Sequence, residues 1–324
     1  MTQSILPWQH ANRDHLLGLQ QRGQMPHALM LHGLPGTGIR QFAEAMAHTI
    51  MCSTEATVPC GKCHTCQLNA AGNHPDLMLL LPEKEGGPIK VDQVRGVVAF
   101  GQASAQQGGY RVVIVCPAEA MNTNAANSLL KTLEEPGAKT LLFLVTYAAA
   151  TVLPTVRSRC QQMAMAVPAA VEGRVWLQQN LSDVTHLELL HLFAPRQPLY
   201  GQRLEPLVSE MQVVANSLPA LVDGSADVLV TANKWAAIEL GQLLRWLYQW
   251  LSAACLVESG QVSADSVAVR IHQAWQSRGP IVQLLDLVEE VVALRRVLAS
   301  GGNPNRQLVL ENLAFQLSSG KPST

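Results

Sequence analysis

Short apolar runs alternate with amphipathic stretches through the first half of the chain. Helical spacing of apolar residues separates most of the runs, notably over 91–106 and 122–134. Strands that alternate with helices imply crossover connections and therefore a parallel sheet. We predict an α/β domain over residues 1–167, with strands over 28–32, 77–81, 111–115, 141–146 and 162–166.

The strand pattern fades beyond residue 167 and helical patterns take over. Residues 168–208 predict a small helical domain, interrupted around 194–198, and residues 209–324 predict an all-α domain. The segment 281–298 is apolar around more than half of its circumference, which predicts a helix buried on two sides. A regular apolar stripe is expected to face the core from Leu240, Leu243, Leu244, Leu247 and Leu251.

Composition supports a packed, multidomain protein. The chain has 324 residues, of which 48% are hydrophobic and 15% charged. A net charge of −1 argues against a protein that holds DNA alone, because such proteins normally carry a basic excess. No apolar run is long enough to cross a bilayer, and the first residues do not resemble a signal peptide, so we expect a cytoplasmic protein without a membrane partner.

A glycine-rich segment, Gly33, Gly36 and Gly38 followed by Ile39 and Arg40, lies between a predicted strand and a predicted helix. This spacing is typical of a P-loop, in which backbone N–H groups surround phosphates. The last two positions call for lysine and a hydroxyl residue, and neither is present here. We expect a tight strand-to-helix turn rather than a functional ATP site, with weak nucleotide binding through backbone amides and Arg40 as the alternative.

The second half of an ATP site is also degraded. A hydrolytic site needs acidic residues after a later strand, to hold the metal ion and orient water. The strand predicted to end at Val115 is followed instead by Cys116 and Pro117. Two independent losses argue against intrinsic ATP hydrolysis more strongly than one.

Four of the seven cysteines lie within fifteen residues, in the pattern C-x7-C-x2-C-x2-C. Two-residue gaps let thiolates converge on one metal ion, and four thiolates complete a tetrahedral zinc shell. A full shell leaves no open position, so the predicted zinc is structural. His64 is a possible substitute ligand, and the expected ligands are Cys52, Cys60, Cys63 and Cys66.

Two segments carry a resemblance to a known family: N-A-A-N-S-L-L-K-T-L-E-E-P over 124–136 and L-P-T-V-R-S-R-C over 153–160. Both resemble signature stretches of the AAA+ clamp-loader subunits of bacterial DNA polymerase III. The cysteine insertion and His74-Pro75-Asp76 are similar to that family as well. Motor subunits keep the P-loop lysine and the acidic pair, so their loss points to the delta-prime class. The delta class is disfavoured, because it generally lacks the zinc module and Ser-Arg-Cys.

The resemblance implies an AAA+ domain with a zinc-module insertion, a helical lid domain and a C-terminal collar domain that joins subunits in a ring. It implies that Arg159 is an arginine finger serving ATP on a neighbouring subunit, with Arg157 as a second candidate. The implied partners are the motor subunits (tau/gamma) and the delta subunit. The sliding clamp and primer–template DNA would be met through the complex.

Two other functions stay open from the residues alone. One is a stand-alone AAA+ ATPase with an unusual nucleotide site. The other is a zinc-dependent DNA-binding module, which the near-neutral charge disfavours. Nucleotide affinity and DNA binding of the isolated chain separate these alternatives from a structural clamp-loader subunit.

Overall fold

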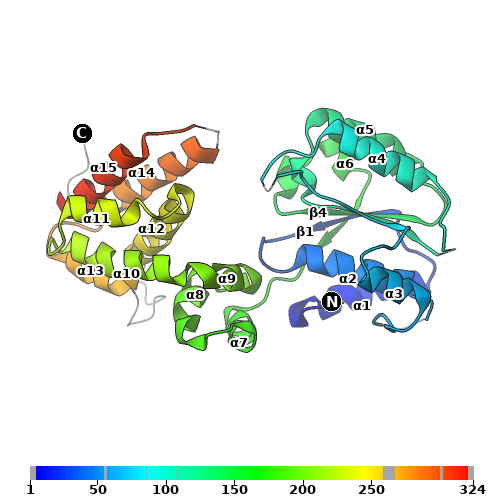
Figure 1. Cartoon of the computed structure of the whole chain (residues 1–324), viewed down its shortest axis with the longest axis horizontal. Coiled ribbons are helices and arrows are strands. Elements are labelled where there is room, and N and C mark those ends of the chain that lie inside the picture. The colour runs from blue at the N-terminus through cyan, green and yellow to red at the C-terminus, as the bar shows by residue number, and fades with distance from the viewer. Residues whose placement is uncertain are drawn as a thin grey trace. The chain divides into compact units, whose positions relative to one another are not determined.

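A computed structural model describes residues 5–54, 57–84, 86–107, 109–257, 267–299 and 302–319. The chain divides into two compact units (Figure 1). The first contains Met1–Leu187 and Ala194–Gln202, and the second contains Glu188–Phe193 and Arg203–Thr324. The three functional domains expected from the sequence, with limits at 167 and 208, stay a prediction.

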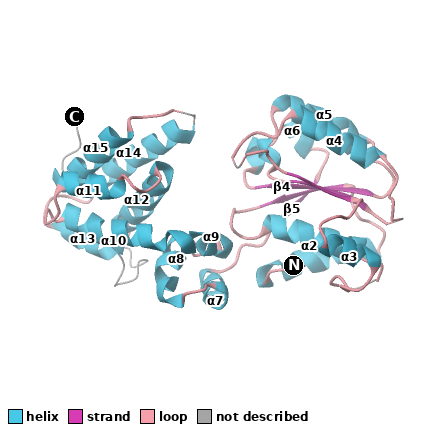
Figure 2. Cartoon of the chain, viewed as in Figure 1, coloured by secondary structure: helices cyan, strands magenta, loops and turns pink. Residues whose placement is uncertain are grey.

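A five-stranded parallel sheet forms the centre of the first unit, in the order β2-β3-β4-β1-β5. This confirms the predicted α/β fold. Helices cover both faces of the sheet (Figure 2), so its central strands are long uninterrupted apolar runs rather than alternating ones. The strands are β1 (Ala28–His32), β2 (Leu77–Leu80), β3 (Arg111–Val115), β4 (Thr140–Thr146) and β5 (Gln161–Ala164).

Successive residues of a strand point to opposite faces of the sheet, which creates two separate cores. Leu29 and Leu31 of β1 pack on the side of α1 (His10–Gln21) and α2 (Ile39–Met51). Met30 packs on the opposite side, against residues of the other helical layer. Figure 1 shows this second layer, which consists of α4 (Val91–Gln102), α5 (Thr123–Glu134) and α6 (Pro154–Arg157).

Short elements complete the first unit around this sheet. A T-shaped ring contact at 6.0 Å joins Trp8 near the N-terminus to Trp176, which lies far along the chain. These elements are η1 (Pro7–Gln9), α3 (His64–Ala70), η2 (Ala118–Ala120), η3 (Ala149–Thr151), α7 (Ala170–Asn180), η4 (Val184–His186) and the first part of α9 (Pro198–Leu204).

The second unit is helical, as predicted. Its core contains the fully buried tryptophans Trp235, Trp246, Trp250 and Trp275, and α12 buries the whole predicted leucine stripe. Its elements are α8 (Leu187–Phe193), of which all but the first residue belong here, the end of α9, η5 (Glu205–Leu207), α10 (Val208–Val222), α11 (Val228–Trp235), α12 (Leu240–Cys255), α13 (Val267–Gln276), α14 (Val282–Ala299) and α15 (Arg306–Ser319).

Helix α14 corrects one expectation. It buries Leu284, Leu287 and Val291 on one face, whereas Val282 and Leu285 on another face are exposed. The apolar pattern therefore reports one packed face within this chain rather than two. None of the described helices is sufficiently long and apolar to span a membrane.

A buried ion pair joins the amino-terminal ends of the neighbouring strands β2 and β3. The Asp76 carboxylate, just before β2, accepts hydrogen bonds from the Arg111 guanidinium at 3.0 Å and from the N–H groups of Gln106 and Gln107 at 2.9 and 2.8 Å. Arg111 also lies over the Phe100 ring at 4.4 Å from its centroid. Burial by itself raises the pKa of Asp76, but the three hydrogen bonds outweigh it, and the net pKa is lowered.

We expect Asp76→Ala to destabilise the first unit by about 3–5 kcal/mol, because it leaves the buried Arg111 charge unpaired. Urea denaturation of the purified chain measures the loss. Asp92→Ala is the matched control, since Asp92 and Arg95 form an exposed pair whose loss should cost at most about 1 kcal/mol. Equal midpoints for the two variants would contradict the assignment.

The same network makes stability depend on pH. The folded-state pKa of Asp76 lies below its unfolded value, so its contribution is complete above the unfolded value of about 3.9. That contribution is lost as pH falls through the folded value. Acid unfolding of Asp76→Asn should therefore show a weaker pH dependence than that of the unmodified chain.

Candidate functional site

The carboxyl ends of the parallel strands meet at one edge of the sheet. The glycine-rich loop follows β1, Cys116 and Pro117 follow β3, and Tyr147 follows β4. This is the edge at which open α/β sheets bind ligands. The structure therefore brings together the positions that a P-loop protein uses for nucleotide.

The glycine-rich loop is packed against other parts of its own chain. Gly36 and Gly38 adopt φ values of +76° and +83°, which glycine accepts without strain. A Cβ atom on Gly36 would lie 2.7 Å from the Cβ atom of Tyr200, and one on Gly38 would lie 2.4 Å from a methyl carbon of Leu6. Both glycines are thus required for contacts within the first unit as well as for the turn.

Hydrogen bonds also tie the loop to these neighbours. The Trp8 indole N–H and the Gln9 amide donate to the Thr37 carbonyl at 2.9 and 3.0 Å. The N–H of Leu199 donates to the Gly36 carbonyl at 3.1 Å. The loop is therefore held by η1 and by the beginning of α9, two elements that the sequence did not connect with it.

The two positions that should hold lysine and a hydroxyl residue are occupied otherwise. Ile39 is buried in the core on the α2 side, and its Cδ1 atom lies 3.2 Å from the place of a Cβ on Gly33. The Arg40 guanidinium pairs with Glu44, one helical turn further along α2, at 2.7 Å. The cation in this loop is therefore matched by an internal carboxylate.

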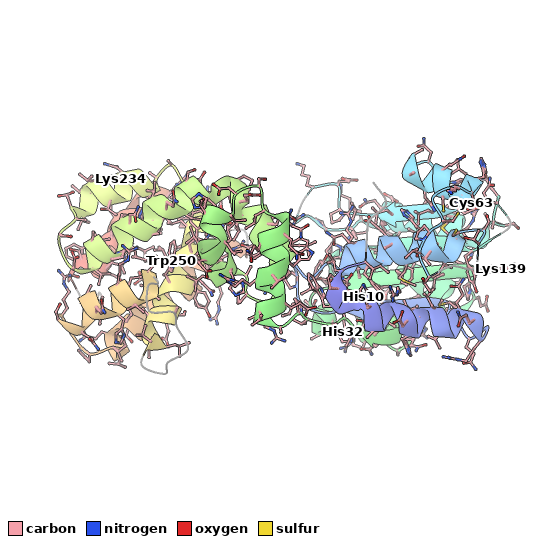
Figure 3. The ribbon with its side chains drawn as sticks, turned by 90° about the horizontal axis from the view of Figure 1, so that it is seen from below. His10, His32, Cys63, Lys139, Lys234 and Trp250 are labelled. Carbon is pink, nitrogen blue, oxygen red and sulfur yellow. The ribbon has the colours of Figure 1, made fainter. Side chains whose placement is uncertain are left out.

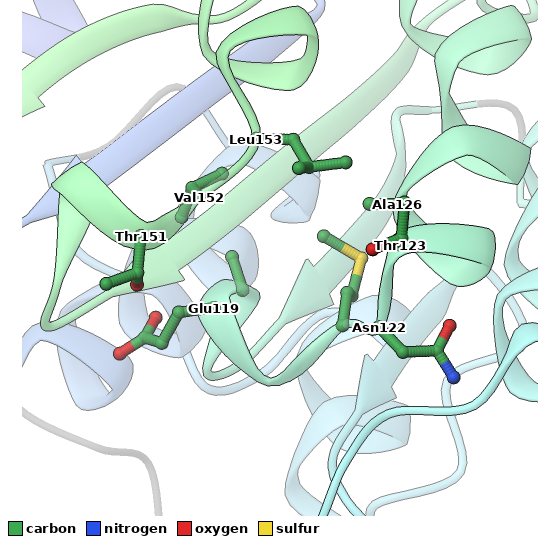
Figure 4. Close-up of a pocket in the computed structure, with 9 residues that line it drawn as sticks. Glu119, Asn122, Thr123, Ala126, Thr151, Val152 and Leu153 are labelled. Carbon is green, nitrogen blue, oxygen red and sulfur yellow. The ribbon is translucent and has the colours of Figure 1, made fainter.

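The segment after β3 carries a carboxylate that the sequence analysis did not consider. Glu119 lies on η2, three residues beyond Cys116, and its Oε1 atom accepts the N–H of Tyr147 at 3.0 Å. It lines a pocket of about 230 Å³ between η2, the start of α5 and η3, on the same side as Thr151 (Figure 4). The sequence could have indicated Glu119 as an acidic residue soon after a predicted strand. Only the two residues directly after that strand, Cys116 and Pro117, were considered in the sequence analysis.

Cys116 itself is buried, and its Sγ atom lies 3.7 Å from the Tyr147 hydroxyl. Burial raises the pKa of the Cys116 thiol, so the thiol stays neutral. Neither this thiol nor Pro117 supplies the anionic oxygen that a magnesium ion requires at this position.

The four cysteines of the predicted zinc module converge. Their Sγ atoms lie within 4.8 Å of one another. The separations of Cys52 from Cys63 and of Cys60 from Cys66 are both 3.9 Å, and Cys66 lies 3.6 Å from Cys52. Zn–S bonds of about 2.3 Å in a tetrahedron place sulfur atoms about 3.8 Å apart. The donor set and its spacing fit a zinc ion.

Local structure explains the convergence. Cys52 follows the end of α2, and Cys63 caps the start of α3, where its sulfur accepts the N–H of Cys66 at 3.5 Å. A hydrogen bond from the Thr65 hydroxyl and a further one from the backbone at Ser53 lower the pKa of Cys63 to about 5. A bound metal ion would join the end of α2 to the beginning of α3. His64, the alternative ligand, is exposed and lies outside the group.

The cysteine cluster is separate from the glycine-rich loop. Figure 3 shows Cys63 well apart from His32, the residue that ends β1 immediately before the loop. A metal ion held by these sulfurs would therefore stabilise the fold locally and would not contact the nucleotide position.

Arg159 lies in the turn between α6 and β5, and its side chain is 35% exposed. Its Nε atom donates to Glu134 at 2.6 Å and its Nη1 atom donates to the Thr155 carbonyl at 3.0 Å. Arg157, the second candidate, is half-buried and reaches the Ala149 carbonyl at 3.5 Å. The two arginines therefore differ in their contacts. Arg159 pairs with a carboxylate of its own chain, whereas the contact given for Arg157 is with a backbone carbonyl.

The parallel sheet, the P-loop-type turn and the four-cysteine insertion define an AAA+ domain of the clamp-loader type. A solved gamma-subunit-related protein of DNA polymerase III from Thermotoga maritima shares this fold, with a TM-score of 0.50 and 17% identity over 94% of this chain and 98% of that chain. The family described as DNA polymerase III, delta subunit, matches residues 8–169, and its C-terminal counterpart matches residues 208–319.

Relatives that align over nearly their full length identify the class of subunit more closely. DNA polymerase III subunit delta′ of Pseudomonas aeruginosa is 36% identical over 97% of this chain and 98% of the relative. The delta′ subunits of Yersinia pestis and Escherichia coli are 33% and 38% identical, over 98% and 96% of this chain and 98% and 94% of the relatives. The chain belongs to the family of DNA polymerase III delta′ subunits, as its motifs predicted.

The purified chain should contain about one zinc ion, held by thiolates. Metal analysis after gel filtration measures the ratio. Cys63→Ser should lower it and should expose the 52–66 region to proteolysis before the rest of the unit unfolds. Cys160→Ser, which changes a buried cysteine outside the cluster, is the control and should keep the metal. A folded, reduced and metal-free chain would refute the assignment.

Proposed function

We propose that this chain is a non-hydrolysing structural subunit of the DNA polymerase III clamp loader. In this role it supplies Arg159 to the ATP site of a neighbouring motor subunit while the sliding clamp is loaded on DNA. The observation that carries the proposal is a contrast between the two ends of the sheet. The P-loop, after β1, is packed against the chain's own residues, whereas Arg159, just before β5, has a side chain that is 35% exposed.

The absence of intrinsic hydrolysis is supported by each part of the nucleotide position. Ile39 is buried in the core, Arg40 is paired with Glu44, and Cys116 is a neutral thiol. Leu6, Trp8 and Tyr200 crowd the loop that would have to surround phosphates. A nucleotide would have to displace these contacts and would still lack a lysine and the acidic pair that hydrolysis requires.

The role of Arg159 in trans is supported by chemistry and position. An arginine stays charged at every physiological pH, and its planar fork matches phosphate oxygens. Arg159 lies at the surface of a unit that has no competent nucleotide site of its own for it to serve. The proposed recipients are the motor subunits (tau/gamma), with the delta subunit, the clamp and primer–template DNA as further members of the assembly.

The isolated chain should neither hydrolyse ATP nor bind it at millimolar concentration. Filter binding of labelled ATP and phosphate release by the chain alone measure the two properties. Ile39→Lys should not restore turnover, because the acidic pair is still missing and the new charge would enter a buried position. Turnover by the single chain, free of motor subunits, would instead favour the stand-alone ATPase.

Arg159→Ala should leave folding and assembly intact and lower ATP-driven clamp loading by the reconstituted complex. Fingers of this kind are worth roughly a thousandfold or more in related phosphoryl-transfer systems. The effect on the whole complex should be smaller, because other interfaces keep their own fingers. Arg159→Lys should be a poor substitute, since lysine lacks the bidentate fork.

The measurement is the ATPase rate stimulated by DNA and clamp, alongside the rate of clamp loading. Arg157→Ala is the matched control, because it removes a neighbouring arginine, the last residue of α6. A normal rate with Arg159→Ala and a slow rate with Arg157→Ala would transfer the role to Arg157. Normal rates with both variants would refute the finger.

A further inference from the structure

Two of the signature segments meet at Arg159. Glu134 is the last residue of α5, and Arg159 follows α6 in the Ser-Arg-Cys turn, 25 residues further along the chain. Helices α5 and α6 pack against each other, which places the carboxylate beside the guanidinium. This pairing was not apparent from the sequence, where Glu134 is explained equally well as part of a solvated helix end.

The contact engages one side of the guanidinium. Nε donates to the Oε1 atom of Glu134 at 2.6 Å, and Nη2 contacts the same oxygen. Nη1 donates to the Thr155 carbonyl at 3.0 Å. Two elements of the chain, the end of α5 and the short helix α6, therefore restrain the guanidinium plane of Arg159 together.

Counting the N–H groups of the Arg159 guanidinium shows which of them these contacts leave available to a ligand. A guanidinium has five N–H groups in one rigid plane, and the described contacts use three of them. One N–H remains on Nη1 and one on Nη2. An arginine with N–H groups left on its terminal nitrogens can still donate to the oxygens of a phosphate.

The position of Glu134 on α5 is electrostatically unfavourable for the helix itself. A carboxylate in the last turn lies at the negative end of the helix dipole. Arg159 offsets this by providing a cation, and Glu134 in turn remains 50% exposed. An exposed ion pair contributes little to folding, so the pair is better explained by what it does to Arg159 than by stability.

We infer that Glu134 is a positioning residue for Arg159, which it holds with one N–H group on each terminal nitrogen left for a ligand. The inference rests on the proposed function of Arg159 as a finger for a neighbour's ATP. An unrestrained arginine loses rotamer freedom when it binds phosphate, and a side chain already held in place loses less. Glu134 would therefore increase turnover without contacting nucleotide.

Complexes reconstituted with single and double variants test this inference. Glu134→Ala should lower the DNA- and clamp-stimulated kcat roughly two- to tenfold, which corresponds to restraint of one flexible side chain. The KM for ATP should stay unchanged, because the neighbour supplies the groups that bind ATP. Glu134→Gln should retain part of the rate, since an amide oxygen still accepts hydrogen bonds. Glu135→Ala removes the adjacent exposed carboxylate and should have no effect.

The double variant separates positioning from a general structural role. In the Arg159→Ala background, Glu134→Ala should cause no further loss, because the side chain that it positions is absent. An equal loss in both backgrounds would show that Glu134 acts independently of Arg159 and would overturn the inference. Thermal unfolding of each free subunit and gel filtration of each complex confirm that the variants fold and assemble.

The outcomes also separate this inference from the proposed function. If Arg159→Ala is slow and Glu134→Ala is as fast as the unmodified complex or faster, the proposed role of Arg159 is supported and the positioning role of Glu134 is refuted. If Arg159→Ala is as fast as the unmodified complex, the proposed role of Arg159 is refuted, and so is the role of Glu134 that depends on it. A slow Glu134→Ala complex whose loss disappears in the Arg159→Ala background supports both.

Discussion

The parallel arrangement of the sheet is the constraint on which the rest of the first unit depends. Because all five strands run in the same direction, the segments that follow β1, β3 and β4 come together at one edge. Burial of both faces under helices keeps this edge fixed, since each central strand contributes side chains to two separate cores. The glycine-rich loop, Cys116, Glu119 and Tyr147 are neighbours for this reason, although they are distant in sequence.

The glycine-rich loop has the backbone turn of a P-loop without its lysine and hydroxyl residue. Gly36 and Gly38 still form the tight turn, but their lack of side chains now also admits Tyr200 and Leu6. The residue in the lysine position has joined the core, and the one arginine of the loop is neutralised within α2. The turn therefore serves packing within the first unit.

Two internal cross-links lie away from this edge. The Asp76–Arg111 pair holds the loop before β3 against the start of β2, and both side chains are buried. The four cysteines bring the end of α2 and the start of α3 to the spacing of a tetrahedral metal site. The pair of Arg159 and Glu134 is much less buried, at 35% and 50% exposure, and contributes correspondingly little to stability.

The sequence by itself determined the local features of this protein. Apolar runs predicted the five strands, glycine spacing predicted the turn after β1, and the two-residue gaps predicted convergence of Cys60, Cys63 and Cys66. These features depend on near neighbours along the chain, so a pattern suffices to reveal them. Only the tertiary structure decided which distant groups meet: Tyr200 with Gly36, Glu119 with Tyr147, and Glu134 with Arg159. It also decided that α14 has one buried face, because the depth of a helix depends on its neighbours in space and its own periodicity does not record them.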